Sequence, residues 1–232
     1  MCGIVAFHGP RSAEALDLVQ GCLLQAAVRG THATGLAWLE GGELHMERAP
    51  VSAVDFVKHY DLGRLAPDEE RLSVVAHTRY STSDLAWNQP LDDEDLALVM
   101  NGVISQDAPE RWPLVEQKPY RTGNDAEVAM RYARLGRRGH MPGSFAIVEL
   151  WSGGEMLAYR NAYRPLYAAP AAGGALVSST LDMLRRVGLT GVLLRPGVVY
   201  DCAGSATAQT FPTSHEEQPE PRDPRQLRCP TE

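Results

Sequence analysis

A cysteine at position 2 can act as a nucleophile that carries its own base. Initiator methionine is normally trimmed when the next side chain is small, so we expect Met1 to be removed and Cys2 to bear a free α-amine. Near neutral pH part of an α-amine population is free base and can take a thiol proton. The thiolate then attacks an acyl carbon. A buried cysteine without a catalytic role is the alternative.

The residues after Cys2 favour a rigid position for it. Gly3 has no side chain, so another segment or a ligand can approach the backbone closely. Ile4, Val5 and Phe7 lie in an apolar run of strand length. A buried strand that begins here would hold the chain end fixed, which supports a nucleophile more than an incidental cysteine.

Four further polar clusters are placed where predicted strands or helices end. A site built on a sheet gathers its functional groups at such ends. The clusters are RGTHATG at 29–35, HTRYST at 77–82, NG at 101–102 and TGNDAE at 122–127.

The elements that must position these clusters alternate between strand-like and helix-like patterns, which predicts one mixed α and β domain. Ser12 is a candidate cap for a helix that ends near residues 29–30, and Gly41-Gly42 predicts a hairpin turn. Further helices are predicted at 53–59, 125–135 and 180–187. Strands are predicted at 34–39, 43–48, 72–79, 96–104, 144–151, 156–160, 166–169 and 175–178.

The pattern dissolves near the end of the sequence. Residues 205–232 hold five prolines among polar residues and offer little apolar surface to offset the entropy of ordering. We therefore expect a domain over 1–204 and a proline-rich tail over 205–232.

Composition excludes several classes of function. The 22 basic and 29 acidic residues give a net charge of −7 without a Lys/Arg-rich block, which argues against nucleic-acid binding. No apolar run reaches the ~18 residues of a membrane span. The four cysteines form no CxxC pair and the histidines no ligand spacing, so we expect reduced thiols, no metal, no cofactor and a cytoplasmic protein.

Taken together, Cys2-Gly3-Ile4-Val5 and the four clusters, in this order, resemble the class II glutamine amidotransferase domain of the N-terminal nucleophile hydrolase superfamily. The resemblance covers roughly residues 2–200 and includes RNAYRPL at 160–166 and Ser178-Ser179. It implies an α+β fold of the four-layer αββα sandwich type. It also implies an enzyme that hydrolyses the side-chain amide of L-glutamine.

The resemblance assigns the chemical step to three residues. Cys2 is the nucleophile and its own amine the base. The Asn101 side-chain amide and the Gly102 N–H stabilise the tetrahedral oxyanion, as neutral donors fixed on an interruption of a strand. Asn-Gly is also common in hairpin turns, and that alternative stays open at this point.

The resemblance also assigns groups to the amino-acid end of glutamine. Arg79 matches the residue that binds the α-carboxylate, with Thr82 as a further hydroxyl and Tyr80 as an aromatic wall. Asp125 matches the partner of the α-ammonium group, and Arg29 lies beside the nucleophile pocket. As isolated residues, Asp125 is equally a helix cap and Arg29 a helix-terminal cation.

The chain departs from its relatives in two respects. Ser83-Asp84 and Asn88-Gln89-Pro90 stand where many members have His-Gly or a similar pair, and Asn-Ala-His-Pro or Asn-Ala-Gln-Pro, in the loop that covers the glutamine site. Most relatives continue into a domain that consumes the ammonia, and this pattern stops about 30 residues before the last residue. A separate synthetase or transferase subunit is therefore the expected acceptor. Two alternatives remain: an amidohydrolase acting on another γ-glutamyl amide, and a non-catalytic glutamine-binding module.

Overall fold

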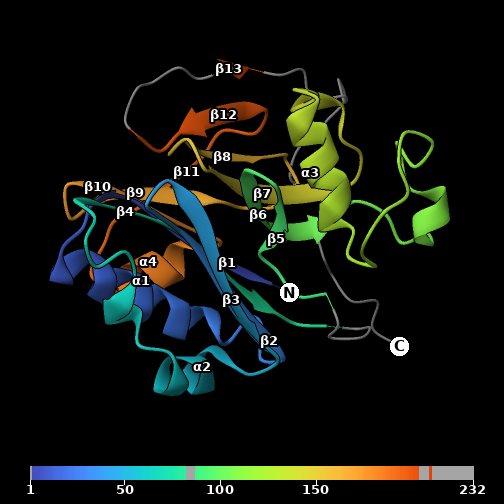
Figure 1. The fold of residues 1–232 in the computed structure, drawn as a ribbon. Helices are drawn as coiled ribbons and strands as arrows, with labels where there is room; N and C mark the ends of the chain where they lie inside the picture. The colour runs from blue at the N-terminus through green and yellow to red at the C-terminus, as the bar shows by residue number, and fades with distance from the viewer. Residues whose placement is uncertain (1, 82–86, 204–208, 211–232) are drawn as a thin grey trace, which may run out of the picture.

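Two antiparallel sheets lie face to face, and helices cover their outer faces (Figure 1). The computed structural model describes residues 2–81, 87–203 and 209–210. Helices α1 (Ala13–Ala26), α2 (Ala53–His59) and α4 (Leu181–Arg186) lie on one side of the pair of sheets, and α3 (Ala126–Arg134) on the other. The resulting order of layers is the αββα sandwich that the family resemblance implies.

The first sheet has seven strands in the order β11-β9-β10-β1-β4-β2-β3, so the strand that follows Cys2 is central. Its strands are β1 (Gly3–Pro10), β2 (Ala33–Glu40), β3 (Glu43–Ala49), β4 (Arg71–Arg79), β9 (Tyr167–Ala171), β10 (Gly174–Ser178) and β11 (Val192–Leu193).

The second sheet has six strands in the order β13-β12-β8-β7-β6-β5. They are β5 (Leu91–Asp93), β6 (Leu96–Val103), β7 (Ser144–Trp151), β8 (Met156–Arg160), β12 (Val198–Asp201) and β13 (Gln209–Thr210). Short 3₁₀ turns occupy Leu62–Arg64, Pro109–Arg111 and Arg138–His140.

Burial on both faces explains why β1 is apolar throughout. Val5 and Phe7 belong to the core shared with α1 and α4. Ile4 and Ala6 belong to the core between the two sheets, because successive side chains of a strand point to opposite faces. A third core lies between the second sheet and α3.

Local signals place several elements as predicted. The Ser12 hydroxyl oxygen caps α1 by accepting a hydrogen bond from the Ala15 N–H at 3.1 Å. Gly41 and Gly42 take φ values of +62° and +78° between β2 and β3, a conformation that suits glycine. The hairpin prediction is confirmed.

Other features differ from the sequence-based expectation. Asn101-Gly102 does not interrupt a strand; both residues lie inside β6, where Asn101 is opposite Ala146 and Gly102 opposite Phe145. That prediction is wrong, and the hairpin-turn alternative is wrong as well. The short strands β5, β11, β12 and β13 were not predicted, because runs of two to four residues show no readable period.

The structure also bears on two expectations about the whole chain. Among the described residues, no helix combines the length and apolar character needed to cross a bilayer. Most of the predicted tail, residues 205–208 and 211–232, lies outside the described part of the chain.

Candidate active site

Strand alternation directs the Cys2 and Arg79 side chains into the space between the sheets. Ile4 belongs to the inter-sheet core, so Cys2, two residues earlier, lies on the same face. On the neighbouring strand β4, Val75 belongs to this core, and the alternation continues through His77 to Arg79. The candidate site therefore lies between the two sheets, at the end of the sandwich where β1 begins and β4 ends.

The same argument brings Asn101 to this space from the opposite sheet. Ala97 and Val99 of β6 belong to the inter-sheet core, so Asn101 follows them on the same face. A hydrogen bond of 3.2 Å between His77 Nε2 and the Met100 carbonyl oxygen joins β4 to β6 directly. Residues that are far apart in the sequence thus meet at one end of the sandwich.

Two contacts fix the start of β1. The Arg29 Nε–H donates to the Cys2 carbonyl oxygen at 2.9 Å. The Ser179 hydroxyl oxygen accepts from the Ile4 N–H at 2.7 Å, while the Ser179 N–H donates to the Ile4 carbonyl at 3.1 Å. Cys2 is therefore held in position by backbone contacts, and its own side chain is half-buried.

Gly3 permits this close packing. A Cβ at this position would lie 2.6 Å from Thr78 Oγ1 and 2.9 Å from the Ala26 Cβ. The Thr78 hydroxyl is itself held there, because it donates to the Ala26 carbonyl at 2.9 Å. A larger residue would displace the chain end from the site.

Burial and two neighbouring residues act on the Arg29 guanidinium. Burial lowers the pKa of its guanidinium, Cys2 raises it, and the positive charge of Arg164 lowers it. Arg164 belongs to the 160–166 segment, to which the sequence assigned no site residue. Its charge acts on Arg29, whose Nε–H donates to the Cys2 carbonyl oxygen, and the sequence gives no local sign of this relation.

The free edge of β6 presents three backbone N–H groups in succession. The Met100 N–H donates to Gln89 Oε1 at 2.5 Å, and the Ile104 N–H donates to Asp125 Oδ2 at 2.6 Å. Because alternate residues of an antiparallel strand direct their backbone groups to the same edge, the N–H of Gly102 points there too.

Contacts on β7 support this orientation of Gly102. Phe145, opposite Gly102, exchanges its backbone hydrogen bonds with Asn161: the Phe145 N–H donates to Asn161 Oδ1 at 3.2 Å, and the Asn161 N–H donates to the Phe145 carbonyl at 3.1 Å. The pair formed by Gly102 and Phe145 is therefore a non-hydrogen-bonded pair.

Asn101 adds a second donor beside this N–H. Its side chain is only 2% exposed, and Nδ2 has no hydrogen-bond partner among the described residues. An unpartnered buried donor is costly, and in a native structure it calls for a functional explanation. Asn101 Nδ2 and the Gly102 N–H together have the chemistry of an oxyanion hole, which needs fixed neutral donors in a site that excludes water.

The Asp125 carboxyl is buried and lies within the influence of the Arg79 charge. Burial raises the pKa of the Asp125 carboxyl, whereas hydrogen bonds from the Ile104 and Ser105 N–H groups and the charge of Arg79 lower it; the net shift is upward. Asp125 precedes α3 but makes no side-chain cap bond there. Its carboxylate instead holds the end of β6, so the helix-cap alternative does not describe it.

The Arg79 guanidinium holds the loop that follows β4. Its Nη1 donates to the Trp87 carbonyl at 2.7 Å and to Asn88 Oδ1 at 2.9 Å. Asn124 Nδ2 donates to the same Trp87 carbonyl at 2.9 Å. The 77–82 and 122–127 clusters are thus joined through one peptide group.

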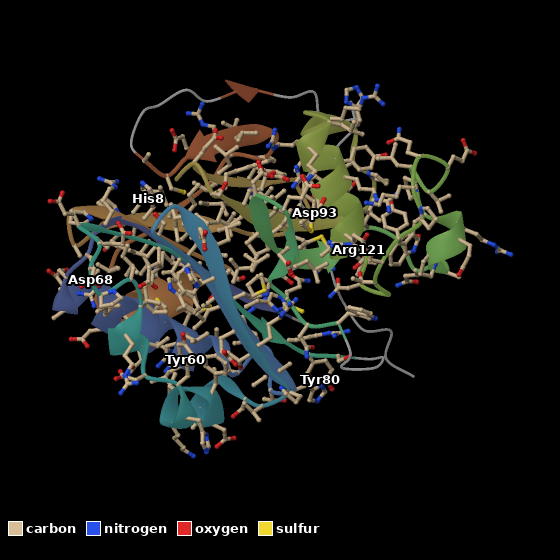
Figure 2. All side chains as sticks on the ribbon, viewed as in Figure 1. His8, Tyr60, Asp68, Tyr80, Asp93 and Arg121 are labelled. Carbon is tan, nitrogen blue, oxygen red and sulfur yellow. The ribbon has the colours of Figure 1, made fainter. Side chains whose placement is uncertain are left out.

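Tyr80 lies at the rim of this end of the molecule. Its ring stacks on that of His32, with centroids 4.7 Å apart, and the Ser81 N–H donates to His32 Nδ1 at 3.0 Å. Figure 2 shows Tyr80 and His8, the latter near the far end of β1, at opposite sides of the molecule. Thr82, the remaining predicted site residue, lies outside the described residues.

The structure adds His77 and Gln89, which sequence reasoning did not assign. Both side chains are buried, and each binds a backbone group of Met100. His77 was visible only as one letter of a cluster, although its alternation with Val75 on β4 was a usable signal. No sequence pattern around Gln89 indicates its role, because its partner, the Met100 N–H, lies on β6 and is brought to it only by the tertiary structure.

Comparison with known proteins gives a sequence match and a fold match. No protein-family model matches the chain. It is 33% identical over 122 residues to the glutamine–fructose-6-phosphate aminotransferase (isomerizing) of Streptomyces coelicolor, which covers 50% of this chain and 19% of that protein. The chain therefore spans about a fifth of the length of this relative.

The fold matches two solved structures at a TM-score of 0.74 and 19% sequence identity. They are the glutamine phosphoribosylpyrophosphate amidotransferase of B. subtilis in complex with ADP and GMP, and the allosteric regulatory enzyme of purine biosynthesis. Each match covers 91% of this chain and 49% of the other. The sequence match and the shared four-layer fold together confirm the resemblance to the class II glutamine amidotransferase domain of the N-terminal nucleophile type.

Proposed function

We propose that this domain hydrolyses L-glutamine to glutamate and ammonia through a thioester on Cys2. The Cys2 α-amine takes the thiol proton, and the sulfur adds to the side-chain amide carbon. When the tetrahedral intermediate collapses, the amine returns the proton to the departing nitrogen, which leaves as ammonia. Water, deprotonated by the same amine, then adds to the thioester and releases glutamate and the thiol.

The unpartnered Asn101 amide is the observation that carries this proposal. In both half-reactions negative charge develops on the former amide oxygen, and Asn101 Nδ2 with the Gly102 N–H offers two donors for it. A domain that only bound glutamine could use such a donor for the amide oxygen, but it would not need a cysteine nucleophile at the start of β1.

The charged residues at the same end support recognition of a free amino acid. Arg79 suits an α-carboxylate, and Asp125 an α-ammonium group. Arg29 supports the nucleophile's backbone, Tyr80 forms part of the rim, and we assign Thr82 to the carboxylate on the family pattern alone. This arrangement needs no metal or cofactor for the steps written above.

We further propose that the ammonia is delivered to a separate acceptor enzyme in the cytoplasm. The name of each relative contains glutamine and a second compound, which is fructose-6-phosphate in one and phosphoribosylpyrophosphate in another. This chain spans only part of each of them. A synthetase or transferase that uses ammonia is the class of partner this chemistry requires.

The proposal is tested by glutamate release from purified protein. Mass spectrometry should show loss of Met1, and hydroxylamine should trap the thioester as γ-glutamyl hydroxamate. Cys2→Ala should release no glutamate yet still bind glutamine. Turnover by Cys2→Ala, or by protein that retains Met1, contradicts the mechanism. A panel of γ-glutamyl amides decides the substrate: fast turnover of a substituted amide, with glutamine a poor substrate, replaces the ammonia-donor role by that of a stand-alone amidohydrolase.

A further inference from the structure

The oxyanion strand has an edge that no neighbouring strand covers at its functional end. In the described part of the chain, β5 pairs only with residues up to Leu98 of β6. Beyond that point the backbone groups on this edge need other partners, since buried N–H and C=O groups are costly when unpaired. The Met100 peptide groups find them in two side chains.

His77 supplies the first partner. Its Nε2 lies 3.2 Å from the Met100 carbonyl oxygen, which can only accept, so Nε2 carries the proton. Burial, with the positive charge of Arg79, lowers the pKa of His77 to about 3. The imidazole is therefore neutral near physiological pH, in one tautomer, and the bond from β4 to β6 persists there.

Gln89 supplies the second partner. Its Oε1 accepts from the Met100 N–H at 2.5 Å, and the side chain is 5% exposed. The Gln89 backbone crosses β2 so closely that a Cβ on Gly35 would lie 2.4 Å from the Gln89 carbonyl oxygen. There is no space for this segment to move toward the sheet.

Two arginines hold the residues that flank Gln89. Arg48 Nη1 donates to the Pro90 carbonyl at 3.0 Å, and Arg79 Nη1 donates to Asn88 Oδ1 at 2.9 Å. Gln89 is therefore presented to β6 by a fixed segment. Through Arg79 that segment also belongs to the predicted carboxylate site.

We propose that His77 and Gln89 are positioning residues that clamp the two peptide groups on either side of the Met100 Cα, and so aim the two oxyanion donors, Asn101 Nδ2 and the Gly102 N–H. The inference rests on the proposed function, because it concerns the same site. Met100 immediately precedes Asn101, so a displacement of these two peptide groups moves both donors together. A misplacement of about 1 Å can cost roughly 10²-fold in rate.

Paired variants test the clamp. Gln89→Met and His77→Leu remove the bond to Met100 and keep the approximate volume. Gln89→Glu keeps an oxygen acceptor, and His77→Gln keeps a nitrogen donor. We expect kcat for glutamate release to fall by about 10²-fold in the first two variants with KM little changed. The conservative partners should recover most of that loss.

His8→Leu is the matched control for loss of a buried neutral histidine. His8 also makes two side-chain hydrogen bonds, to Ser73 at 2.9 Å and to Arg71 at 2.9 Å, but it lies near the far end of β1. We expect His8→Leu to lower stability and leave kcat near the wild-type value.

Alkylation of Cys2 by iodoacetamide separates the clamp from general damage to the site. This displacement builds no oxyanion, so its rate should be unchanged in Gln89→Met and His77→Leu. Wild-type kcat in both variants overturns the proposal. A loss of kcat matched by equally slow alkylation also overturns it, because the nucleophile would then be disturbed.

Hydrogen exchange gives a readout that does not depend on activity. Amides of β6 (Leu96–Val103) should exchange faster in Gln89→Met than in wild type or Gln89→Glu, while β1 is unaffected. Equal exchange in β6 overturns the clamp even if the enzyme is active. A wild-type protein that releases no glutamate but shows the exchange difference would contradict the proposed function and leave the clamp standing.

Discussion

At the residue scale, the site is defined by polar atoms that the fold leaves without partners. Asn101 Nδ2 is one such atom, since it is buried and unpaired among the described residues. Most buried polar atoms of the described residues are satisfied by strand pairing or by side chains, as the Met100 backbone is. His77 Nδ1 is a second unpartnered buried atom there, and in the proposed reaction Asn101 Nδ2 is the one whose hydrogen bonding a substrate oxygen completes.

Replacement of Asn101 by leucine tests that role. Asn101→Leu keeps the approximate side-chain volume and removes the donor, so we expect kcat for glutamate release to fall roughly 10²–10³-fold with KM nearly unchanged. Steady-state kinetics measure the loss. Glutamine binding to the Cys2→Ala protein, with and without Asn101→Leu, is the control and should give similar dissociation constants. A kcat within a few-fold of wild type contradicts the assignment.

Arg79 is tested by keeping its charge and changing its shape. Lysine cannot make a planar two-point contact, so Arg79→Lys should lower kcat/KM for glutamine by about 10- to 100-fold, the scale of one charge-assisted hydrogen bond. The matched substrate is glutamine in which an amide replaces the α-carboxylate, so that it lacks the charge that Arg79 would bind. If Arg79 binds the carboxylate, the variant should discriminate much less than wild type between the two substrates. Equal discrimination in both proteins would assign Arg79 to the loop alone.

At the element scale, β6 is the strand on which the candidate site depends. It pairs with β7 along its full length, and its free edge carries the Gly102 N–H between two occupied neighbours. Gly102 is required because β7 approaches closely: a Cβ there would lie 2.0 Å from the Ser144 carbonyl oxygen. The same packing that fixes the donor excludes any side chain.

Gly102→Ala should therefore destabilise the protein. The added methyl group meets backbone atoms, which cannot rotate away, and overpacking of this kind costs about 1–3 kcal/mol in the free energy of unfolding. Chemical denaturation measures the change. Gly153→Ala is the control, since a Cβ there meets nothing within 4 Å, and its effect should stay within about 0.5 kcal/mol. Equal stability of the two variants would contradict the close approach of β6 and β7.

At the scale of the whole molecule, packing of the two sheets against each other buries the ionisable side chain of His77. His77 is 1% exposed, and burial lowers its pKa to about 3. In the unfolded chain the imidazole titrates near ~6.5. Between about pH 6.5 and 3 the unfolded state therefore binds a proton that the native state does not.

Stability should fall as the pH is lowered through this window. The His77 contribution to the free energy of unfolding decreases by about 1.4 kcal/mol per pH unit below ~6.5, because protons favour the unfolded chain. His77→Gln has no titrating group, so its stability should depend less steeply on pH. Urea denaturation at pH 7, 6 and 5 measures how the free energy of unfolding depends on pH in wild type and in His77→Gln. Other titrating groups, such as His8, whose pKa is also lowered by burial, contribute equally to both proteins, so the difference between the two slopes isolates His77. Parallel curves would mean that His77 is not buried as a neutral base.

Sequence alone determined the elements whose signals are local. The apolar run after Cys2, the Ser12 cap and the Gly41-Gly42 turn each specify backbone conformation within a few residues, and the structure agrees with all three. The ordered motifs also led to the fold class, because an ordered set of motifs is specific even when each is weak.

Tertiary structure decided what depends on contacts between distant segments. The local preference of Asn101-Gly102 for a turn is overridden by pairing with β7, more than forty residues later. The roles of His77 and Gln89 depend on Met100, from which they are 23 and 11 residues away. The physical reason is that periodicity and turn chemistry act within a few residues, whereas partners for buried polar groups are chosen only when the two sheets close over them.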